Sequence, residues 1–291
     1  MAESINAIRQ HLESVKQTRQ ITNAMYLLSA SRYKRTVAGM DYHLRYLESL
    51  RRTMRHILYV TKGAGLHDVY LDKSPAGCAL FLVMMGDKGL CGNYNQAVAA
   101  LAEEQLKKKP GAKLVCFGLS GEPYLRHRGI VPDRVFPGSS MHPDLPMASS
   151  FSKTLLEMYL TDDFNEVYVI YTPHASRAGG PVSFRMLPLL RHDFSDVSEA
   201  DLPTEILYDP SAAEVFAHIV PQYCTGLLYD FMMQSAACEN AARMEAMQSA
   251  TENADKMLQT LQLRLNEVRQ QTITNEITEI AAASALREKG I

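Results

Sequence analysis

The sequence contains no tryptophan, no proline before Pro75 and no long apolar run. Its longest uninterrupted apolar segment is CALFLVMM (78–85), far shorter than the stretch of about 20 residues that a membrane-spanning helix needs. The start, MAESINAIRQ, carries charge where a secretory signal is apolar, and it lacks the Arg/Ser-rich, acid-poor character of a transit peptide. These features predict a cytoplasmic protein, or a peripheral one that partners recruit to a membrane.

Cysteine and histidine show no spacing that suggests a disulfide framework or a metal site. The 5 cysteines are odd in number and none forms a CxxC pair, so we expect reduced thiols. No two of the 9 histidines lie three to five residues apart, and no GxSxG motif, HExxH motif or acidic cluster occurs. The sequence therefore predicts no metal and no cofactor.

One segment, TPHASRAGGP (172–181), remains a weak candidate for catalysis. It is glycine-rich and follows the apolar run VYVIYT, so His174 or Arg177 could act on a substrate there. A solvated loop is the simpler interpretation.

Helix breakers are scarce at both ends of the chain. Gly39 is the only glycine before Gly63, and the apolar residues Ile5, Ile8, Leu12 and Val15 follow helical spacing. Towards the other end no proline occurs after Pro221, and an apolar and alanine stripe with a period near 3.7 continues to Val268. We expect an N-terminal helical region at 1–62 and a C-terminal one at 212–291.

The length of the C-terminal helix limits how it can pack. Its proline-free part would be roughly 100 Å long at 1.5 Å per residue. A compact chain of this size is only about 50 Å across, so the helix needs a partner beyond the globular part. The N-terminal helix, which is rich in bases, would supply one as an antiparallel coiled coil with the acid-rich C-terminal helix. A bundle of shorter helices broken by unmarked turns is the alternative.

The middle of the chain, residues 77–208, has the pattern of an α/β domain. Short apolar runs of the buried-strand type occur at 78–85, 113–118 and 167–172, and helical stretches at 96–109, 121–127 and 145–160 separate them. The segment 181–190 alternates more and contains Pro188, which favours a hairpin or edge strand. The predicted fold class is α/β: a long antiparallel coiled coil with an inserted, doubly wound Rossmann-like domain.

The turn GDKGLCGNYN (86–95) follows the first of these runs and resembles a phosphate-binding loop. Its glycines, Gly86, Gly89 and Gly92, form GxxGxxG, which matches neither the dinucleotide motif nor the phosphate loop. No acid follows the second run, KLVCFG, to hold a ribose. A tight turn that needs glycine for positive φ is the favoured interpretation, with anion binding at the helix N-terminus as the alternative.

Three separated regions carry a resemblance to one family. The start, INAIRQHLESVKQTRQITNAMYLLSASRYKR, the turn GDKGLCGNYN, and the C-terminal ENAARMEAMQSATENADKM and LNEVRQQTITNEITEIAAASAL resemble the gamma subunit of F-type ATP synthases. The resemblance covers both ends and the turn; the middle adds only the order of strands and helices.

The resemblance implies a rotor shaft that is not itself an enzyme. In the family the terminal helices turn inside a ring of alpha and beta subunits and drive the catalytic sites of beta, while the α/β foot meets the epsilon subunit and the ring of c subunits. This chain would then work as a peripheral protein at the cytoplasmic face of a bacterial cell membrane, without nucleic acid and attached to the membrane only through the complex.

The resemblance also implies roles for particular residues. Arg243 would face the beta-subunit lever, with Met25 near that contact, and Arg269, Gln270 and Thr274 would meet beta-subunit loops higher on the shaft. Ile277 and Ile280 would belong to an apolar tip. In the foot turn, Gly86, Asp87, Gly89, Cys91 and Gly92 match the family signature, and Cys91 would be a small buried side chain.

Two other classes of function stay open on the residues alone. One is an α/β nucleotide-binding enzyme with coiled-coil arms. The other is a nucleic-acid adaptor that uses the basic N-terminal helix, although a sequence pI near 6.5 argues against it.

Overall fold

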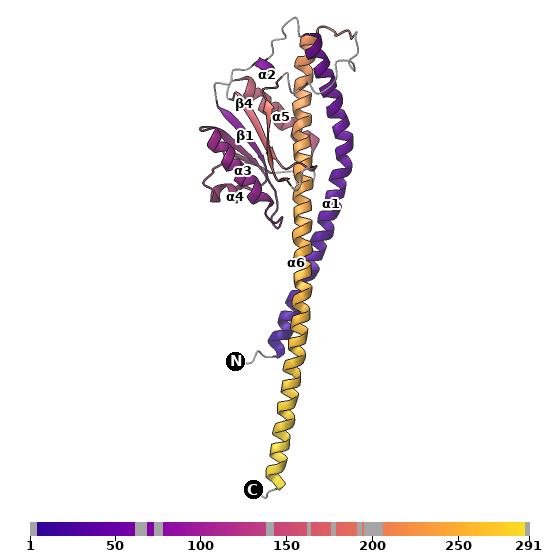
Figure 1. The fold of residues 1–291 in the computed structure, drawn as a ribbon, viewed down its shortest axis with the longest axis vertical. Helices are drawn as coiled ribbons and strands as arrows, with labels where there is room; N and C mark the ends of the chain where they lie inside the picture. The colour runs from indigo at the N-terminus through magenta and orange to yellow at the C-terminus, as the bar shows by residue number, and fades with distance from the viewer. Residues whose placement is uncertain are drawn as a thin grey trace. The chain divides into compact units, whose positions relative to one another are not determined.

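A computed structural model of the chain describes residues 5–61, 69–72, 78–137, 143–161, 164–175, 179–190, 194 and 206–288. In order along the chain, the elements are α1 (Ile5–Val60), α2 (Val69–Asp72), β1 (Ala79–Met84), α3 (Tyr94–Lys108), β2 (Lys113–Phe117), α4 (Glu122–His127), β3 (Arg134–Phe136), α5 (Leu145–Leu160), β4 (Glu166–Tyr171), β5 (Val182–Leu187) and α6 (Ala212–Glu288) (Figure 1). The chain divides into two compact units, Met1–Leu28 with Met244–Ile291, and Ser29–Arg243.

The two terminal helices are long and unbroken, as the scarcity of breakers predicts. α1 has 56 residues and α6 has 77. α6 begins before Pro221 and continues through it, so the helix is longer than its proline-free part. A proline inside a helix removes one backbone hydrogen bond, and the buried neighbours Val220, Tyr223 and Cys224 hold this stretch by packing.

In the unit Met1–Leu28 with Met244–Ile291, α1 and α6 pair antiparallel. Their apolar stripes bury Ile8 and Val15 against Ala254 and Leu261. The pairing continues as an ion pair between Arg19 and Asp255 and a hydrogen bond of 2.7 Å between the hydroxyls of Thr22 and Thr251. Lower numbers on α1 meet higher numbers on α6, which is the predicted antiparallel arrangement.

In the unit Ser29–Arg243, the same two helices also approach closely. Met40 packs against Met233 and Ala237, and His43 Nε2 lies 2.8 Å from the carbonyl oxygen of Gly226. A Cβ at Gly226 would come within 2.6 Å of Leu47 Cδ2, so a larger residue there would require the Leu47 side chain to move. Small residues on α6 therefore set how near the helices come.

The α/β part of this unit is a five-stranded sheet in the order β3-β2-β1-β4-β5. The first four strands are parallel, and β5 is antiparallel to β4 at the edge, as the alternating and proline-containing segment predicts. β3 has only three residues and was not among the predicted strands. The sheet confirms the predicted Rossmann-like α/β class.

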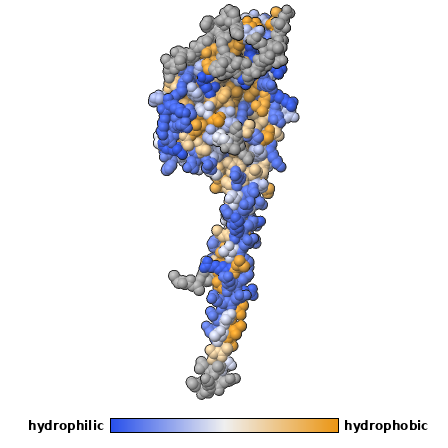
Figure 2. Space-filling model, in the orientation of Figure 1, coloured by the Kyte–Doolittle hydropathy of each residue, from blue (hydrophilic) through white to orange (hydrophobic). Residues whose placement is uncertain are grey.

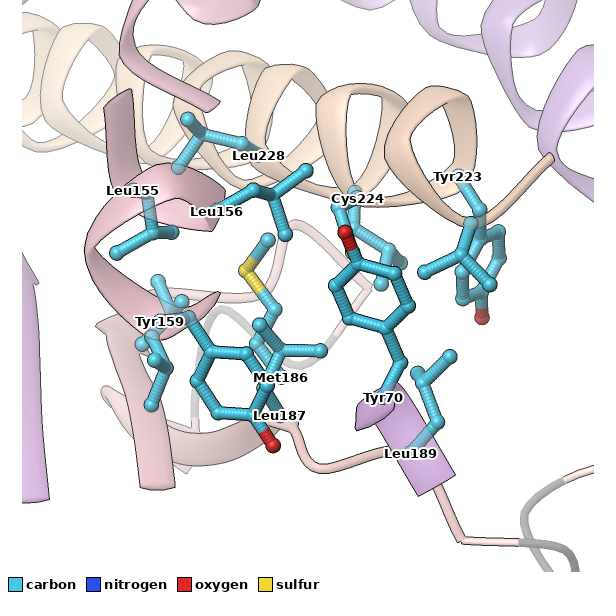
Figure 3. Packing of buried hydrophobic residues seen from close by; sticks show 14 of the residues in the cluster. Tyr70, Leu155, Leu156, Tyr159, Met186, Leu187, Leu189, Tyr223, Cys224 and Leu228 are labelled. Carbon is cyan, nitrogen blue, oxygen red and sulfur yellow. The ribbon is translucent and has the colours of Figure 1, made fainter. Parts of the chain in front are cut away.

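Helices cover both faces of this sheet. Alternate β1 residues Phe81 and Val83 join α3 and α4 in one cluster, whereas Leu80, Leu82 and Met84 join α5 and α6 in the other. Figure 3 shows the second cluster, where side chains of α5 and α6 meet the end of β5 and Tyr70 of α2. The continuous apolar runs are explained by this burial on two faces.

Among the described helices, none is both long enough and apolar enough to cross a bilayer.

Candidate functional site

The signature turn lies where β1 ends and α3 begins. Gly86 donates its N–H to Asn95 Oδ1 at 2.8 Å, which ties the start of the turn to α3. Ser120 donates its hydroxyl to the carbonyl oxygen of Asp87 at 2.7 Å, and the Leu119 N–H donates to Asp87 Oδ1 at 3.2 Å. The turn is therefore held by the loop that follows β2 as well as by α3.

The glycines of the turn serve different purposes. Gly92 has the positive φ (60°) that the tight-turn interpretation expects, and Leu90, which is not glycine, has a φ of 63°. Gly86 is needed for space, because a Cβ there would lie 3.0 Å from the carboxylate of Glu239. A Cβ at Gly89 would meet nothing within 4 Å.

This turn borders the place where a ligand would bind in a sheet of this topology. β1 lies between β2 and β4, so the chain leaves β1 towards one side of the sheet and later returns to the other. Parallel α/β sheets bind ligands at this switch point, outside the carboxyl ends of the strands. The segments that follow β1 and β4 form the walls of that crevice.

The crevice is occupied by α6 of the same chain. Cys238 Sγ lies 3.4 Å from the carbonyl oxygen of Thr172, and the His174 N–H donates to Gln234 Oε1 at 3.0 Å, both beyond β4. Beyond β1, Tyr94 donates its hydroxyl to the carbonyl oxygen of Ser235 at 3.3 Å. The helix thus contacts both walls, so a nucleotide would have to displace it.

Arg243 forms the polar centre of this contact. Its guanidinium donates to the carbonyl oxygens of Lys88 (2.8 Å) and Gly89 (3.1 Å) and to Glu239 Oε1 (2.5 Å). Arg243 is 4% exposed and Glu239 1%. The Glu239 carboxylate next to Gly86 is therefore paired with a guanidinium, and both side chains are buried where α6 meets the turn.

Two side chains at the turn and at the start of α3, Cys91 and Tyr94, have a raised pKa. Burial, reinforced by the nearby Glu239 carboxylate, raises the pKa of the Cys91 thiol, while Arg243 opposes the shift. Burial and the same carboxylate also raise the pKa of Tyr94. Cys91 is buried, as predicted, and its thiol is poorly suited to act as a nucleophile.

Apart from Arg243, the predicted shaft residues lie in the unit Met1–Leu28 with Met244–Ile291. Met25 is half-buried on α1, and Arg269, Gln270, Thr274, Ile277 and Ile280 are exposed on α6. From Ile273 to Ser284 every side chain is exposed, and Figure 2 shows hydrophobic atoms among them near the C-terminal end of α6. Their contacts with partners remain predictions.

The weak catalytic candidate is not supported by the site geometry. His174 Nε2 lies 3.0 Å from the Tyr33 hydroxyl, and its backbone N–H is bonded to α6, so the residue links α1, α6 and the loop after β4. Arg177 lies outside the described residues. A cavity of about 680 Å³ lies between α5 and the face of the sheet, lined largely by apolar residues such as Phe117, Phe136 and Phe151. It is not part of the crevice.

Within the described part of the chain, no group of three or more His, Cys, Asp or Glu side chains could hold a metal ion. Sequence reasoning missed Glu239 as a partner of Arg243. The signal was present, because the two residues are four apart on a helix.

Comparisons with known proteins agree with this architecture. A profile of the family described as ATP synthase matches residues 4–286. The ATP synthase gamma chain of Ruminiclostridium cellulolyticum is 34% identical over 98% of this chain and 100% of its own length. That of Caldanaerobacter subterraneus is 33% identical over 94% and 97%, and the sodium ion specific gamma chain of Acetobacterium woodii is 30% identical over 98% and 99%.

Solved structures share the fold at lower sequence identity. A rotor chain of the Euglena gracilis mitochondrial ATP synthase aligns with a TM-score of 0.64 at 17% identity, over 92% of this chain and 98% of that one. A central stalk chain of the Tetrahymena thermophila enzyme aligns with a TM-score of 0.58 at 20% identity, over 79% and 99%. With near full-length similarity to several curated gamma chains, this chain belongs to the ATP synthase gamma chain family.

Proposed function

We propose that this chain is the central rotor shaft of an F-type ATP synthase and that it is not itself catalytic. The observation that carries the proposal is the full-length similarity to gamma chains. The paired α1 and α6 and the filled crevice support it, because a shaft needs stiff helices and no substrate site of its own.

The proposed mechanism is mechanical coupling. A shaft whose sides differ presents a different surface to each neighbour in a surrounding ring as it turns. Each orientation then favours a different conformation of each neighbour, which is how rotation would drive catalytic sites on other subunits. On this chain the exposed part of α6, with Ile273, Ile277 and Ile280, offers the apolar surface for such contacts.

The proposed partners follow from family membership. They are the alpha and beta subunits around the shaft, and the epsilon subunit and the c-subunit ring at the α/β unit. The chain would work at the cytoplasmic face of the bacterial cell membrane, as a peripheral subunit held there by the complex, with no cofactor and no nucleic acid.

Reconstitution tests the proposal. The purified chain is mixed with alpha and beta subunits of its own organism, and ATP hydrolysis is measured with and without it. We expect a stable complex with high activity, and no ATP, ADP or NAD binding by the isolated chain in calorimetric titration. Micromolar nucleotide binding by the isolated chain, or no assembly with alpha and beta, would overturn the proposal.

A further inference from the structure

The guanidinium of Arg243 is fully engaged inside its own unit. Nε donates to the Gly89 carbonyl oxygen, Nη2 to the Lys88 carbonyl oxygen and to Glu239, and Nη1 lies 3.5 Å from Asn240 Oδ1. The side chains of Arg243 and Glu239 are 5% and 2% exposed. The resemblance assigns Arg243 to a partner's acidic lever, but these bonds point its charge inwards.

The group that this guanidinium holds is the backbone of the signature turn. Lys88 and Gly89 are consecutive, and their two carbonyl oxygens face the planar fork, an arrangement that a lysine ammonium cannot reproduce. The next residue, Leu90, has a φ of 63° and is 62% exposed. An apolar side chain held outwards in a rarely populated backbone conformation suggests function.

The turn is also fixed at its other side. The bond between Gly86 and Asn95 and the bonds of Asp87 to the 119–120 loop hold its start. Lys88, Gly89 and Leu90 form an exposed run between Asp87 and the buried Cys91. The Lys88 ammonium next to the exposed Leu90 side chain fits a partner surface that has acidic residues around an apolar recess. Arg243 and Glu239 therefore set the shape of the exposed turn surface, although both are buried beneath it.

We infer that Arg243 and Glu239 are a positioning pair: they fasten the 86–92 turn to α6 and act on partner subunits only through that turn. The inference rests on the proposed rotor function. A positioning role and a direct contact of Arg243 with a partner lead to different expectations. Arg243→Lys keeps the positive charge that a direct contact would use, and Glu239 is buried, so a partner could not touch it.

The first test measures the turn in the isolated full-length chain. Amide hydrogen exchange over residues 86–93 is compared for wild type, Arg243→Lys and Glu239→Gln. We expect exchange about tenfold faster or more in both variants, because local opening loses its main restraint. The matched controls are Arg126→Lys and Glu122→Gln, which alter a far less buried i,i+4 pair on α4 and should leave the turn unchanged.

The second test measures coupling in the reconstituted membrane complex, as ions transported per ATP hydrolysed. We expect both buried-pair variants to lower the ratio by about threefold or more, whereas the α4 controls keep it. Wild-type coupling in Arg243→Lys and Glu239→Gln would overturn the inference, as would unchanged exchange in the turn.

A third variant keeps the inference testable if the buried-pair variants do not fold. Leu90→Asn introduces a residue that tolerates positive φ, so it removes the exposed apolar side chain without straining the backbone. We expect normal exchange in the turn but lowered coupling, and full coupling would contradict the role given to the turn. If the wild-type chain itself fails to assemble, the proposed function fails; if wild type works and every variant matches it, only this inference fails.

Discussion

Individual glycines of this chain differ in why they are glycine. Gly118, after β2, has a φ of 113°, and a Cβ there would lie 2.2 Å from the carbonyl oxygen of Met85. Gly39 lies inside α1, and a Cβ at that position would meet nothing within 4 Å. At position 118 a side chain would clash with the backbone, so glycine is required there. At position 39 glycine is not required for space and only lowers the stability of the helix.

Substituting these two glycines by alanine should have opposite effects. Gly118→Ala should destabilise the chain by about 3 kcal/mol or more, since it combines backbone strain with a clash against a carbonyl. Gly39→Ala should stabilise it by about 0.5–1 kcal/mol, because alanine loses less entropy in a helix. Urea denaturation of both variants beside wild type measures the difference, and equal midpoints would contradict the prediction.

The cysteines should differ sharply in reactivity. Cys78 is half-exposed, and the other four are buried. Burial raises the pKa of Cys116 and of Cys224 to about 12, and that of Cys91 also lies above its usual value. Since the thiolate is the nucleophile, we expect a thiol reagent at pH 8 to modify Cys78 quickly and the others only after denaturation. Cys78→Ser should remove the fast phase, and a second fast thiol would contradict the burial.

At the scale of elements, α6 carries a buried acid where it packs in the unit Ser29–Arg243. Asp230 Oδ2 accepts a hydrogen bond of 2.6 Å from Gln234 Nε2, while Oδ1 has no partner among the described residues. Burial raises the pKa of the Asp230 carboxyl, opposed by the bond from Gln234 and by His43 of α1. The charged form is therefore disfavoured in the folded chain.

This shift gives stability a definite pH dependence. A raised pKa in the folded state means that the folded chain binds the proton of Asp230 more tightly than the unfolded chain does. The stability that this proton contributes is fully present below the unfolded pKa and is lost as the pH rises through the folded pKa. Asp230→Asn keeps the acceptor for Gln234 and removes the charge. We expect it to exceed wild type in stability by about 1–2 kcal/mol at pH 8.

The advantage of Asp230→Asn should shrink as the pH falls through the raised folded pKa of Asp230, and it should be lost below the ordinary value of a carboxyl group. Urea midpoints at several pH values measure it, and Asp144→Asn, the same substitution at the exposed start of α5, is the control. An Asn variant less stable than wild type at pH 8 would show that the charge is favourable.

Elements differ in how far the sequence predicts them. The strands β1, β2 and β4 and the helices α3, α4 and α5 lie within a few residues of the predicted segments. β3 was missed because three residues show no periodicity, and α2 because one helical turn carries no stripe. Pro221 shows the opposite problem: tertiary packing keeps a helix going through a residue that disfavours it.

At the scale of the whole molecule, the proposed shaft should tolerate changes in isolation that it does not tolerate in the complex. Ile277 and Ile280 are 62% and 70% exposed, whereas Leu261 is 8% exposed between α6 and α1. Polar substitution should therefore act on different properties at the two places.

Ile277→Asp with Ile280→Asp should leave the stability of the isolated chain within about 0.5 kcal/mol of wild type. The same pair should lower ATP hydrolysis by the reconstituted complex, because the substituted surface is the one proposed to meet the ring. Leu261→Asp, the matched control, should destabilise the isolated chain by about 3 kcal/mol, since it buries a charge. Unchanged hydrolysis with the double variant would remove Ile277 and Ile280 from the proposed contact.

The sequence by itself determined the long terminal helices, the α/β class and the family. These depend on local properties: missing breakers, apolar period and motif letters. It also contained Glu239 and Arg243 four residues apart, but not what they hold. Only the tertiary structure brought Arg243 to the carbonyl oxygens of Lys88 and Gly89 and placed α6 in the crevice of the sheet. Such contacts join segments some 150 positions apart, and packing of the sheet against α6 decides them, which no local pattern encodes.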